Sequence, residues 1–326
     1  MKKSIFWVFC LLVLGIVVLT GCSCRNSQNP SLKTEPESHK FTVLSTTRMI
    51  HDGVQRIGGD AVHSVVLMDG AIDPHSYELV KGDGDKIGQA DLVFANGLGL
   101  EHSLSLQKAL KTDPRTVFLG DLLFERHPNW FISDDGVLDP HIWLDLCLWA
   151  ETIDDIVRSL SEKLPLHAKE FDKRGRELKN EMLALDSWSV DVFAAIPEKK
   201  RFLITGHDAF RYFTRRYLAL DSEKTSDLWR IRCTAPEGIS PEAQIGFKDI
   251  ARVAYYAIEH EVDIVFPESG LNKEGLKKVV SSVKGKRDVR LSKSLIYSDS
   301  VALGGVDFLD TFRHNVRVIS EGLAHA

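Results

Sequence analysis

Short apolar runs alternate with helical stretches along most of the chain, and this alternation constrains the fold more than any other feature. We expect strands at residues 41–44, 62–67, 92–95, 117–119, 201–205, 262–266 and 295–297. Helical patterns lie between them, for example over residues 49–57 and 245–258. Strands separated by helices are typical of an α/β fold with a parallel sheet. The strands fall into two groups, so the sequence predicts two α/β lobes.

One long helical segment, at about residues 166–196, separates the two groups of strands. Its apolar residues recur at helical spacing between two prolines: Phe171, Leu178, Met182, Leu185 and Val192, between Pro165 and Pro197. At about 1.5 Å per residue, about 30 helical residues would reach about 45 Å. We therefore expect one rigid connecting helix, residues 166–197, that joins an N-terminal lobe, residues 41–165, to a C-terminal lobe, residues 198–326.

The first forty residues predict a targeting signal. Lys2 and Lys3 precede an apolar run over residues 5–19, which has the length of a signal peptide and is too short for a transmembrane helix. The run ends in Leu19-Thr20-Gly21-Cys22, which resembles the bacterial lipobox, in which cleavage leaves an acylated cysteine. We expect a signal peptide at 1–21, a lipid on Cys22, a flexible tether at 22–40 and a periplasmic protein anchored to a membrane. An ordinary signal peptide with an incidental cysteine is the alternative.

The composition excludes several classes of protein. The formal net charge of −5 gives no basis for a nucleic-acid partner. Five cysteines among 326 residues are too few for a disulfide-held scaffold or a four-cysteine zinc ribbon. Cys147 and Cys233 lie within the predicted lobes, and nothing in the sequence indicates that they are paired.

The tripeptide Asp-Pro-His occurs twice, at residues 73–75 and 139–141. Because Asp is a favoured N-cap and Pro a favoured first helical residue, we expect each histidine to stand at the start of a helix. His207 follows the predicted strand 201–205, and Asp299 follows the predicted strand 295–297. Ligands of α/β proteins bind at loops beyond the carboxyl ends of strands. Three imidazoles and one carboxylate would make a transition-metal site of His75, His141, His207 and Asp299.

Each of these residues also has a simpler explanation. A single histidine is more often a surface or core residue, and Asp-Pro-His can serve only as a helix cap. Three aspartates lie next to the candidate ligands and could orient the imidazole rings as hydrogen-bond acceptors: Asp73, Asp139 and Asp208. For Asp73 and Asp139, capping the start of a helix is an equal alternative. Glu268 either lines the same cleft or is an ordinary surface carboxylate. His51 and His102 are candidate neighbours of the site.

Seven short motifs occur in order along the chain. They are Asp-Pro-His-Ser-Tyr-Glu at 73–78, Asn-Gly-Leu-Gly-Leu-Glu at 96–101, Asp-Pro-His-Ile-Trp-Leu-Asp at 139–145, Thr-Gly-His-Asp-Ala-Phe at 205–210, Gly-Ile-Ser-Pro-Glu-Ala at 238–243, Tyr-Ser-Asp-Ser at 297–300 and His-Asn-Val at 314–316. Together they resemble the TroA-like family, the metal-binding receptors of bacterial ABC importers, over about residues 41–320. The resemblance implies two α/β lobes joined by one long helix, with a metal in the cleft between them.

The resemblance also implies roles for individual residues and partners. By motif match, His75 and His141 would be ligands from the N-terminal lobe, and His207 and Asp299 ligands from the C-terminal lobe. We expect a monomer that binds one divalent transition metal ion, Fe²⁺, Mn²⁺ or Zn²⁺, and delivers it to a cognate ABC permease and its ATPase. Receptors of this kind perform no chemistry on the metal, so no enzymatic activity is expected.

Two departures from the family pattern leave the metal open. The chain lacks the long His-rich, acidic loop of zinc-dedicated members, and it has His207 where manganese-dedicated members often have Glu. Three nitrogens and a carboxylate suit Zn²⁺ and Fe²⁺ and tolerate Mn²⁺, and intrinsic affinity favours Zn²⁺. Since the imidazoles must be neutral, we expect metal occupancy to fall as the pH drops through about 6.5. Residues 221–237 also form a longer stretch than is usual, and its conformation is left open.

Two other functions are alternatives. A zinc hydrolase also uses three histidines, with Asp208 as a candidate base, but Asp299 would close the coordination position that a catalytic water needs. The chain also has no His-Glu-x-x-His helix. A surface adhesin with a structural metal is the second alternative, and it would keep its partner after removal of the metal.

Overall fold

The computed structural model describes residues 40–240 and 245–325 of the chain. The predicted signal peptide, the lipid attachment at Cys22 and the tether up to residue 39 lie outside the described residues. Among the helices that are described, none is long and apolar enough to cross a membrane.

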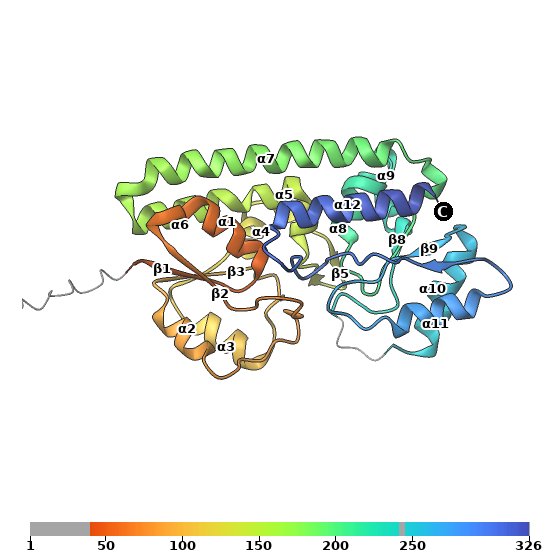
Figure 1. The fold of residues 1–326 in the computed structure, drawn as a ribbon, viewed down its shortest axis with the longest axis horizontal. Coiled ribbons are helices and arrows are strands. Elements are labelled where there is room, and N and C mark those ends of the chain that lie inside the picture. Colours follow the sequence, from red (N-terminus) through yellow and green to blue (C-terminus); the bar gives the residue numbers. More distant parts are fainter. Residues whose placement is uncertain (1–39, 241–244, 326) are drawn as a thin grey trace, which may run out of the picture. The chain divides into compact units, whose positions relative to one another are not determined.

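Four parallel strands form one sheet in the first half of the chain, in the order β2-β1-β3-β4 (Figure 1). They are β1 (Thr42–Ser45), β2 (His63–Val66), β3 (Leu92–Ala95) and β4 (Thr116–Phe118). Successive side chains of a strand point to opposite faces. Val43 accordingly joins the apolar cluster of α1 (Arg48–Gly58), whereas Leu44 joins that of α2 (Asp83–Gln89) and α3 (Leu104–Thr112). Helices thus cover both faces of this sheet, which we call the N-terminal lobe.

Two pairs of short parallel strands lie in the second half of the chain. They are β7 (Leu203–Ile204) with β8 (Cys233–Thr234), and β9 (Ile264–Val265) with β10 (Arg290–Leu291). A bridge between Thr205 and Phe266 joins the two pairs. Helices α10 (Phe247–Glu259) and α11 (Glu274–Val283) share an apolar cluster with Ile204 and Val265. This second part, which we call the C-terminal lobe, confirms the prediction of two parallel α/β lobes.

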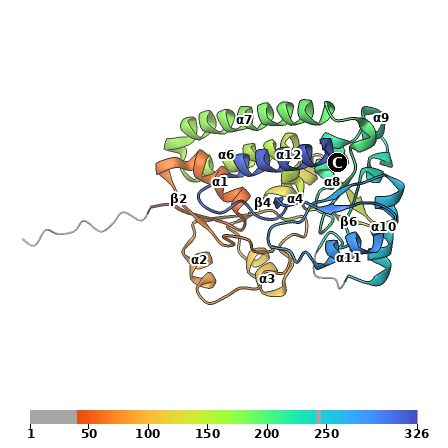
Figure 2. The same cartoon turned by 45° about the vertical axis from the view of Figure 1, so that its right-hand side comes forward.

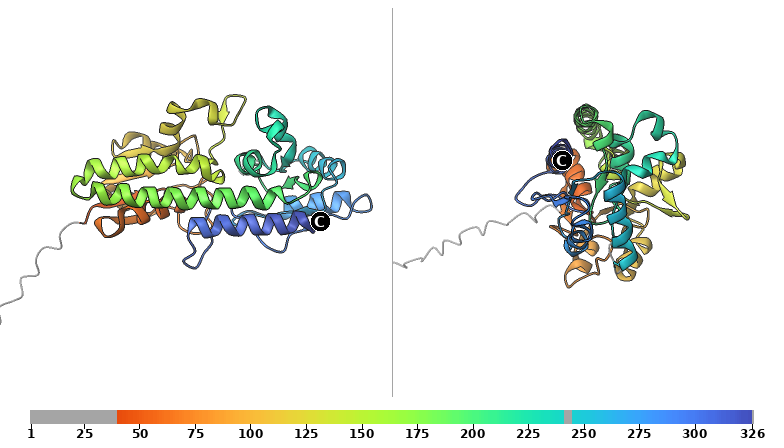
Figure 3. Two further views of the ribbon diagram at one scale, coloured as in Figure 1. Left: turned by 90° about the horizontal axis from the view of Figure 1, so that it is seen from above. Right: turned by 90° about the vertical axis from the view of Figure 1, so that its right-hand side faces the viewer.

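The long helix α7 (Ala168–Ala194) has 27 residues and packs against elements of both lobes. Among the elements that precede it in the sequence, α7 contacts α1, α5 (Leu146–Ala150) and α6 (Thr152–Lys163). Among those that follow, it contacts α12 (Phe308–Ala324). Figures 2 and 3 show α6, α7 and α12 running side by side. Of the apolar residues that predicted this helix, four are buried and Val192 is half-buried; the four are Phe171, Leu178, Met182 and Leu185. A straight helix of this length, about 40 Å, fixes how far apart the lobes lie.

The structure differs from the predicted strands in three places. Residues 295–297 form no strand, and only Ile296 makes an isolated bridge, to Glu268. Strands β8 and β10 are not among the predicted ones, because two residues are too few for a periodic pattern. An antiparallel hairpin, β5 (Ser133–Asp134) and β6 (Val137–Leu138), is also new; it turns through Asp135 and Gly136, which both have positive φ. Asp-Gly is a common sequence for such a turn.

Short helices connect these elements. They are α4 (Leu119–Arg126), α8 (Arg211–Phe213), α9 (Asp221–Lys224), the π-turn η6 (Thr214–Leu218), and the 3₁₀ turns η1 (Gly59–Ala61), η2 (Pro128–Trp130), η3 (Ile142–Leu144), η4 (Pro165–His167), η5 (Glu198–Lys200) and η7 (Asp227–Arg232). The sequence leaves the conformation of residues 221–237 open. In the structure, α9, η7 and β8 make up most of this stretch. A buried ion pair of 2.8 Å between Arg232 and Glu223 holds it together.

We predict that Asp186→Ala weakens the attachment of α7 to the C-terminal lobe. Asp186 is buried and accepts hydrogen bonds from Arg216 Nε at 2.9 Å and from the Tyr217 hydroxyl at 2.9 Å. Its removal leaves these groups without their acceptor, so the free energy of unfolding should fall by about 2 kcal/mol. Asp172→Ala, which breaks an exposed pair with Arg176 on the same helix, should cost less than about 0.5 kcal/mol. Urea unfolding of both variants checks this, and equal losses would contradict it.

Candidate metal centre

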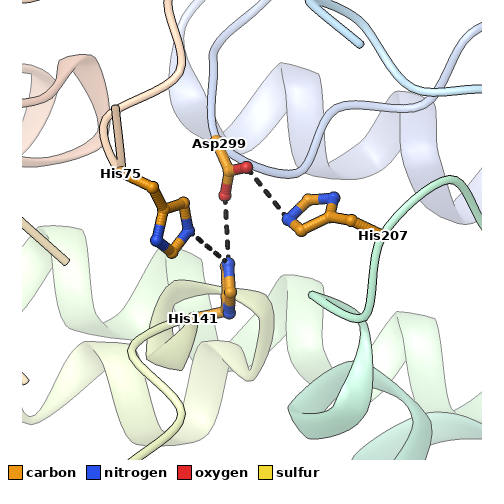
Figure 4. A group of neighbouring side chains, drawn as sticks. All are labelled: His75, His141, His207 and Asp299. Carbon is orange, nitrogen blue, oxygen red and sulfur yellow. Dashed lines mark hydrogen bonds and ion pairs between the residues drawn. The ribbon is translucent and has the colours of Figure 1, made fainter. Parts of the chain in front are cut away.

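Four buried side chains from four separate segments converge between the two lobes: His75, His141, His207 and Asp299. One ligand atom of each lies within 4.8 Å of the ligand atoms of the other three (Figure 4). His75 lies in the loop between β2 and α2, and His141 lies between β6 and η3. His207 follows β7, and Asp299 follows the bridge at Ile296. The chain therefore brings together all four residues that the sequence singles out.

The ligand atoms face one another across a small space (Figure 4). His141 Nε2 lies 3.2 Å from His75 Nε2 and 3.3 Å from Asp299 Oδ1. His207 Nε2 lies 3.1 Å from Asp299 Oδ2. Three nitrogens and one carboxylate oxygen so arranged are the donor set of a transition-metal site.

Two of the three imidazole rings, those of His141 and His207, have a carboxylate beside the nitrogen that faces away from the cluster. Asp139 Oδ1 lies 2.8 Å from His141 Nδ1, and Glu268 Oε2 lies 2.8 Å from His207 Nδ1. Both carboxylates are buried, and Glu268 also accepts hydrogen bonds from the backbone N–H groups of Gly206 and His207. An acceptor at Nδ1 fixes the ring and leaves Nε2 free to bind a metal. Asp139 and Glu268 thus lie where a ring-orienting acceptor must be.

Asp73 and Asp208 lie elsewhere. The Asp73 carboxylate accepts a hydrogen bond from the His75 backbone N–H at 2.9 Å and closes a turn; no helix begins there, contrary to the expectation from Asp-Pro-His. Asp208 forms an ion pair with Arg211. Neither carboxylate therefore makes a hydrogen bond to a ligand ring in the described structure. At the second tripeptide, a 3₁₀ turn follows His141 directly.

His51 and His102 differ in their relation to the cluster. His51 Nδ1 contacts the Ser64 hydroxyl at 2.9 Å, which places it within the N-terminal lobe. The His102 ring lies 5.8 Å from the His75 ring, centroid to centroid, so His102 adjoins the cluster.

Sequence reasoning missed three residues that position the ligands. The Ser240 hydroxyl lies 3.2 Å from His75 Nδ1. The buried Trp143 donates its indole N–H to the carbonyl of Ser298 at 2.6 Å, next to Asp299. Asn315 exchanges two hydrogen bonds with the backbone of Tyr297. All three lie within the quoted motifs, so the signal was present, but sequence spacing does not show which atoms they meet.

The comparisons with known proteins agree with this geometry. Residues 43–322 match the ZnuA family, described as zinc-uptake complex component A, periplasmic. The chain belongs to this family. It is 46% identical to "Metal-binding protein YtgA" of Chlamydia trachomatis over 313 residues, which are 96% of this chain and 95% of that protein. It is 29% identical to "Manganese-binding lipoprotein MntA" of Bacillus subtilis, over 94% of this chain and 95% of that protein.

Solved structures of the family match as well. The crystal structure of Fe(III)-bound YtgA from Chlamydia trachomatis has a TM-score of 0.83 and 47% identity, and the match covers 87% of this chain and 98% of that one. The periplasmic zinc-binding protein TroA from Treponema pallidum has a TM-score of 0.79 and 26% identity, with 87% of this chain and 99% of that one covered. The ZnuA-family fold is therefore shared over nearly all of the described residues.

Burial and charge set the protonation of the cluster. Burial would raise the pKa of Asp299, but His207 and His141 lower it well below the usual range, so the carboxylate is ionised. Burial would lower the pKa of His141, but Asp139 and Asp299 raise it to about 9, and Glu268 and Asp299 raise the pKa of His207 well above its usual value. Burial lowers the pKa of His75 to about 3. The Nε2 atom of a neutral His75 can therefore accept a hydrogen bond from the protonated Nε2 of His141.

We predict that the three ligand histidines titrate apart in the metal-free protein. His75 should stay neutral down to a pH of about 3, whereas His141 should stay protonated up to about 9. Imidazole ¹⁵N chemical shifts, followed over a pH titration, measure this. Asp299→Asn should lower the pKa of both His141 and His207, because it removes the charge that they share. Three rings that all titrate near pH 6.5 would contradict the buried ionic cluster.

Proposed function

We propose that this chain is the receptor of an ABC metal importer, which captures one divalent transition metal ion and delivers it to its permease. His75 and His141 of the N-terminal lobe would bind the ion together with His207 and Asp299 of the C-terminal lobe. The single observation that carries the proposal is the convergence of these four buried donors within 4.8 Å. Membership of the ZnuA family supports it.

The donor set supports several metals. Three imidazoles and one carboxylate suit Zn²⁺ and Fe²⁺ and tolerate Mn²⁺, with the greatest intrinsic affinity for Zn²⁺. The relatives differ in their metals: one YtgA structure holds Fe(III), TroA is described as zinc-binding and MntA as manganese-binding. We propose a site that binds several of these metals. Which ion the protein carries in the cell would then depend on which metal is available.

We propose the cellular setting from the sequence and the relatives. Residues 1–21 would be a signal peptide, Cys22 the lipidated residue and residues 22–40 a tether that holds a monomeric periplasmic receptor to the membrane. Residues 41–165 would form one domain and residues 198–326 the other, with the helix at 166–197 between them. The permease and its ATPase would be the partners. The names of MntA, a lipoprotein, and of the periplasmic ZnuA family support this setting.

The hydrolase alternative loses support at two residues. As a fourth ligand, Asp299 would occupy the coordination position that a catalytic water needs. Asp208, the candidate base, forms an ion pair with Arg211 and makes no hydrogen bond to the cluster in the described structure. We propose that the protein performs no chemistry on its metal.

We predict that metal binding depends on both lobes. Titration calorimetry of the chelator-stripped protein with Zn²⁺, Mn²⁺ and anaerobic Fe²⁺ should show one equivalent bound at about micromolar affinity or tighter, with Zn²⁺ tightest. His75→Ala and Asp299→Ala should each weaken binding at least about a hundredfold, because each removes one of four donors. His63→Ala, an exposed histidine of β2, is the matched control and should bind as the wild type does.

The other outcomes of this titration separate the alternatives. Stoichiometric binding that is indifferent to both ligand variants would contradict the proposed site. Ester or peptide turnover that is lost in His207→Ala would favour the hydrolase. Binding of a partner protein that is unchanged after the metal is stripped would favour the adhesin.

We predict that metal affinity rises with pH well above 6.5, the value expected from unperturbed histidines. In the metal-free protein His141 has a pKa of about 9 and the pKa of His207 is also raised, so a metal must displace their protons at neutral pH. Protonated forms compete with the metal, so lowering the pH from 8 to 6 should weaken Zn²⁺ binding about tenfold per pH unit for each proton displaced. Calorimetry in buffers of different ionisation enthalpy counts those protons. A constant affinity between pH 8 and 6 would contradict the prediction.

A further inference from the structure

The three ligand histidines are supported unequally. Asp139 and Glu268 are carboxylates that approach His141 and His207 at 2.8 Å, and each lies in the same lobe as the ring it supports. His75 belongs to the N-terminal lobe, yet its Nδ1 meets the hydroxyl of Ser240, which follows β8 in the C-terminal lobe. Among the described residues, the His75–Ser240 contact is thus the one at an Nδ1 atom of a ligand histidine that joins the two lobes.

The chemistry of the Ser240 contact suits a metal-binding ring. When Nε2 of a neutral imidazole binds a metal, the proton stands on Nδ1. The Ser240 Oγ, 3.2 Å away, can accept that proton in a hydrogen bond. A neutral hydroxyl increases the basicity of the ring less than a carboxylate does. His75 is therefore the most weakly supported of the three nitrogen ligands.

The segment that carries His75 touches the C-terminal lobe in two further places. Gly270 has a φ of +82°, and a Cβ added to it would lie 3.3 Å from the carbonyl oxygen of Ala71. A Cβ added to Gly70 would lie 3.8 Å from a methyl group of Leu303. Ser240, Gly270 and Leu303 thus meet the N-terminal lobe along one short stretch, residues 70–75.

These contacts close the cluster. The His75 residue is 1% exposed and the Asp299 side chain is 8% exposed, so the cluster is largely shielded from solvent. His141 and His207 are 0% exposed and their supports lie within their own lobes. Parting of the lobes would therefore remove the support of His75 and leave the carboxylate contacts of His141 and His207 in place.

We propose that Ser240 is a positioning residue for His75 and that this contact between the lobes retains the metal. When the lobes part, His75 is the first ligand to leave the metal. The proposal rests on the proposed function and adds the order in which the ligands release the ion. It assigns Ser240 no direct contact with the metal.

The test is the rate of metal release from the purified full chain loaded with Zn²⁺ or Mn²⁺, followed by stopped flow with an excess of a fluorescent chelator. Ser240→Ala should increase the dissociation rate by about tenfold or more, the usual effect of removing a partner of a metal-binding histidine. The association rate should change little, since all four ligands remain. Ser240→Thr keeps the hydroxyl and should restore the slow release.

Controls separate this role from a structural one. Ser282→Ala removes an exposed hydroxyl that bonds the Lys278 carbonyl on α11, and it should release metal as the wild type does. The thermal stability of the metal-free Ser240→Ala protein should equal that of the wild type. An unchanged release rate in Ser240→Ala, or no rescue by Ser240→Thr, would overturn the proposal. Failure of the wild type to bind one equivalent of metal would instead overturn the proposed function.

Discussion

The buried negative charge of Asp299 is the constraint on which the site depends. An ionised carboxylate away from water is stable only when hydrogen-bond donors or positive charge surround it. His207 supplies part of this from the same lobe at 3.1 Å, and His141 supplies part from the other lobe at 3.3 Å. Because neither lobe holds the full set, the charge of Asp299 is best compensated when the lobes are together, by protons in the metal-free protein and by the cation in the loaded one.

The fold keeps Asp299 at that point through contacts to the two residues that precede it. Trp143 of the N-terminal lobe bonds the carbonyl of Ser298, and Asn315 of α12 bonds the backbone of Tyr297. Helix α12 in turn packs along α7, which also contacts α1 and α6 of the N-terminal lobe. A continuous helix across both lobes favours small relative movements, because a sharp kink in it would break some of its own hydrogen bonds. Such a rigid connection is consistent with release of the ion when only the contacts between residues 70–75 and the C-terminal lobe part.

The sequence predicted the parts of this arrangement that have a local signature. Apolar spacing located α7 and the strands β1 to β4, and two Asp-Pro-His tripeptides pointed to His75 and His141. Sequence reasoning missed the strands that form only through tertiary contacts. Strands β8 and β10 have two residues each and form by pairing with their parallel neighbours. The sequence named Asp139 and Glu268 among the candidate partners of the rings, but it could not show which candidates meet a ring nitrogen. Asp73 and Asp139 begin the same tripeptide and both accept a hydrogen bond from the histidine backbone N–H, yet only Asp139 meets a ring nitrogen.

The unequal support of the three imidazoles resolves two opposing demands on a receptor for metal ions. Tight capture needs strongly basic ligands, and Asp139 and Glu268 provide them at His141 and His207. Delivery needs one ligand that leaves without a large barrier, and a ring held by a hydroxyl meets this need better than one held by a carboxylate. Placing that hydroxyl on the opposite lobe makes the weakest ligand depend on closure. Affinity in the closed state and release in the open state can then be set by different residues of the same site.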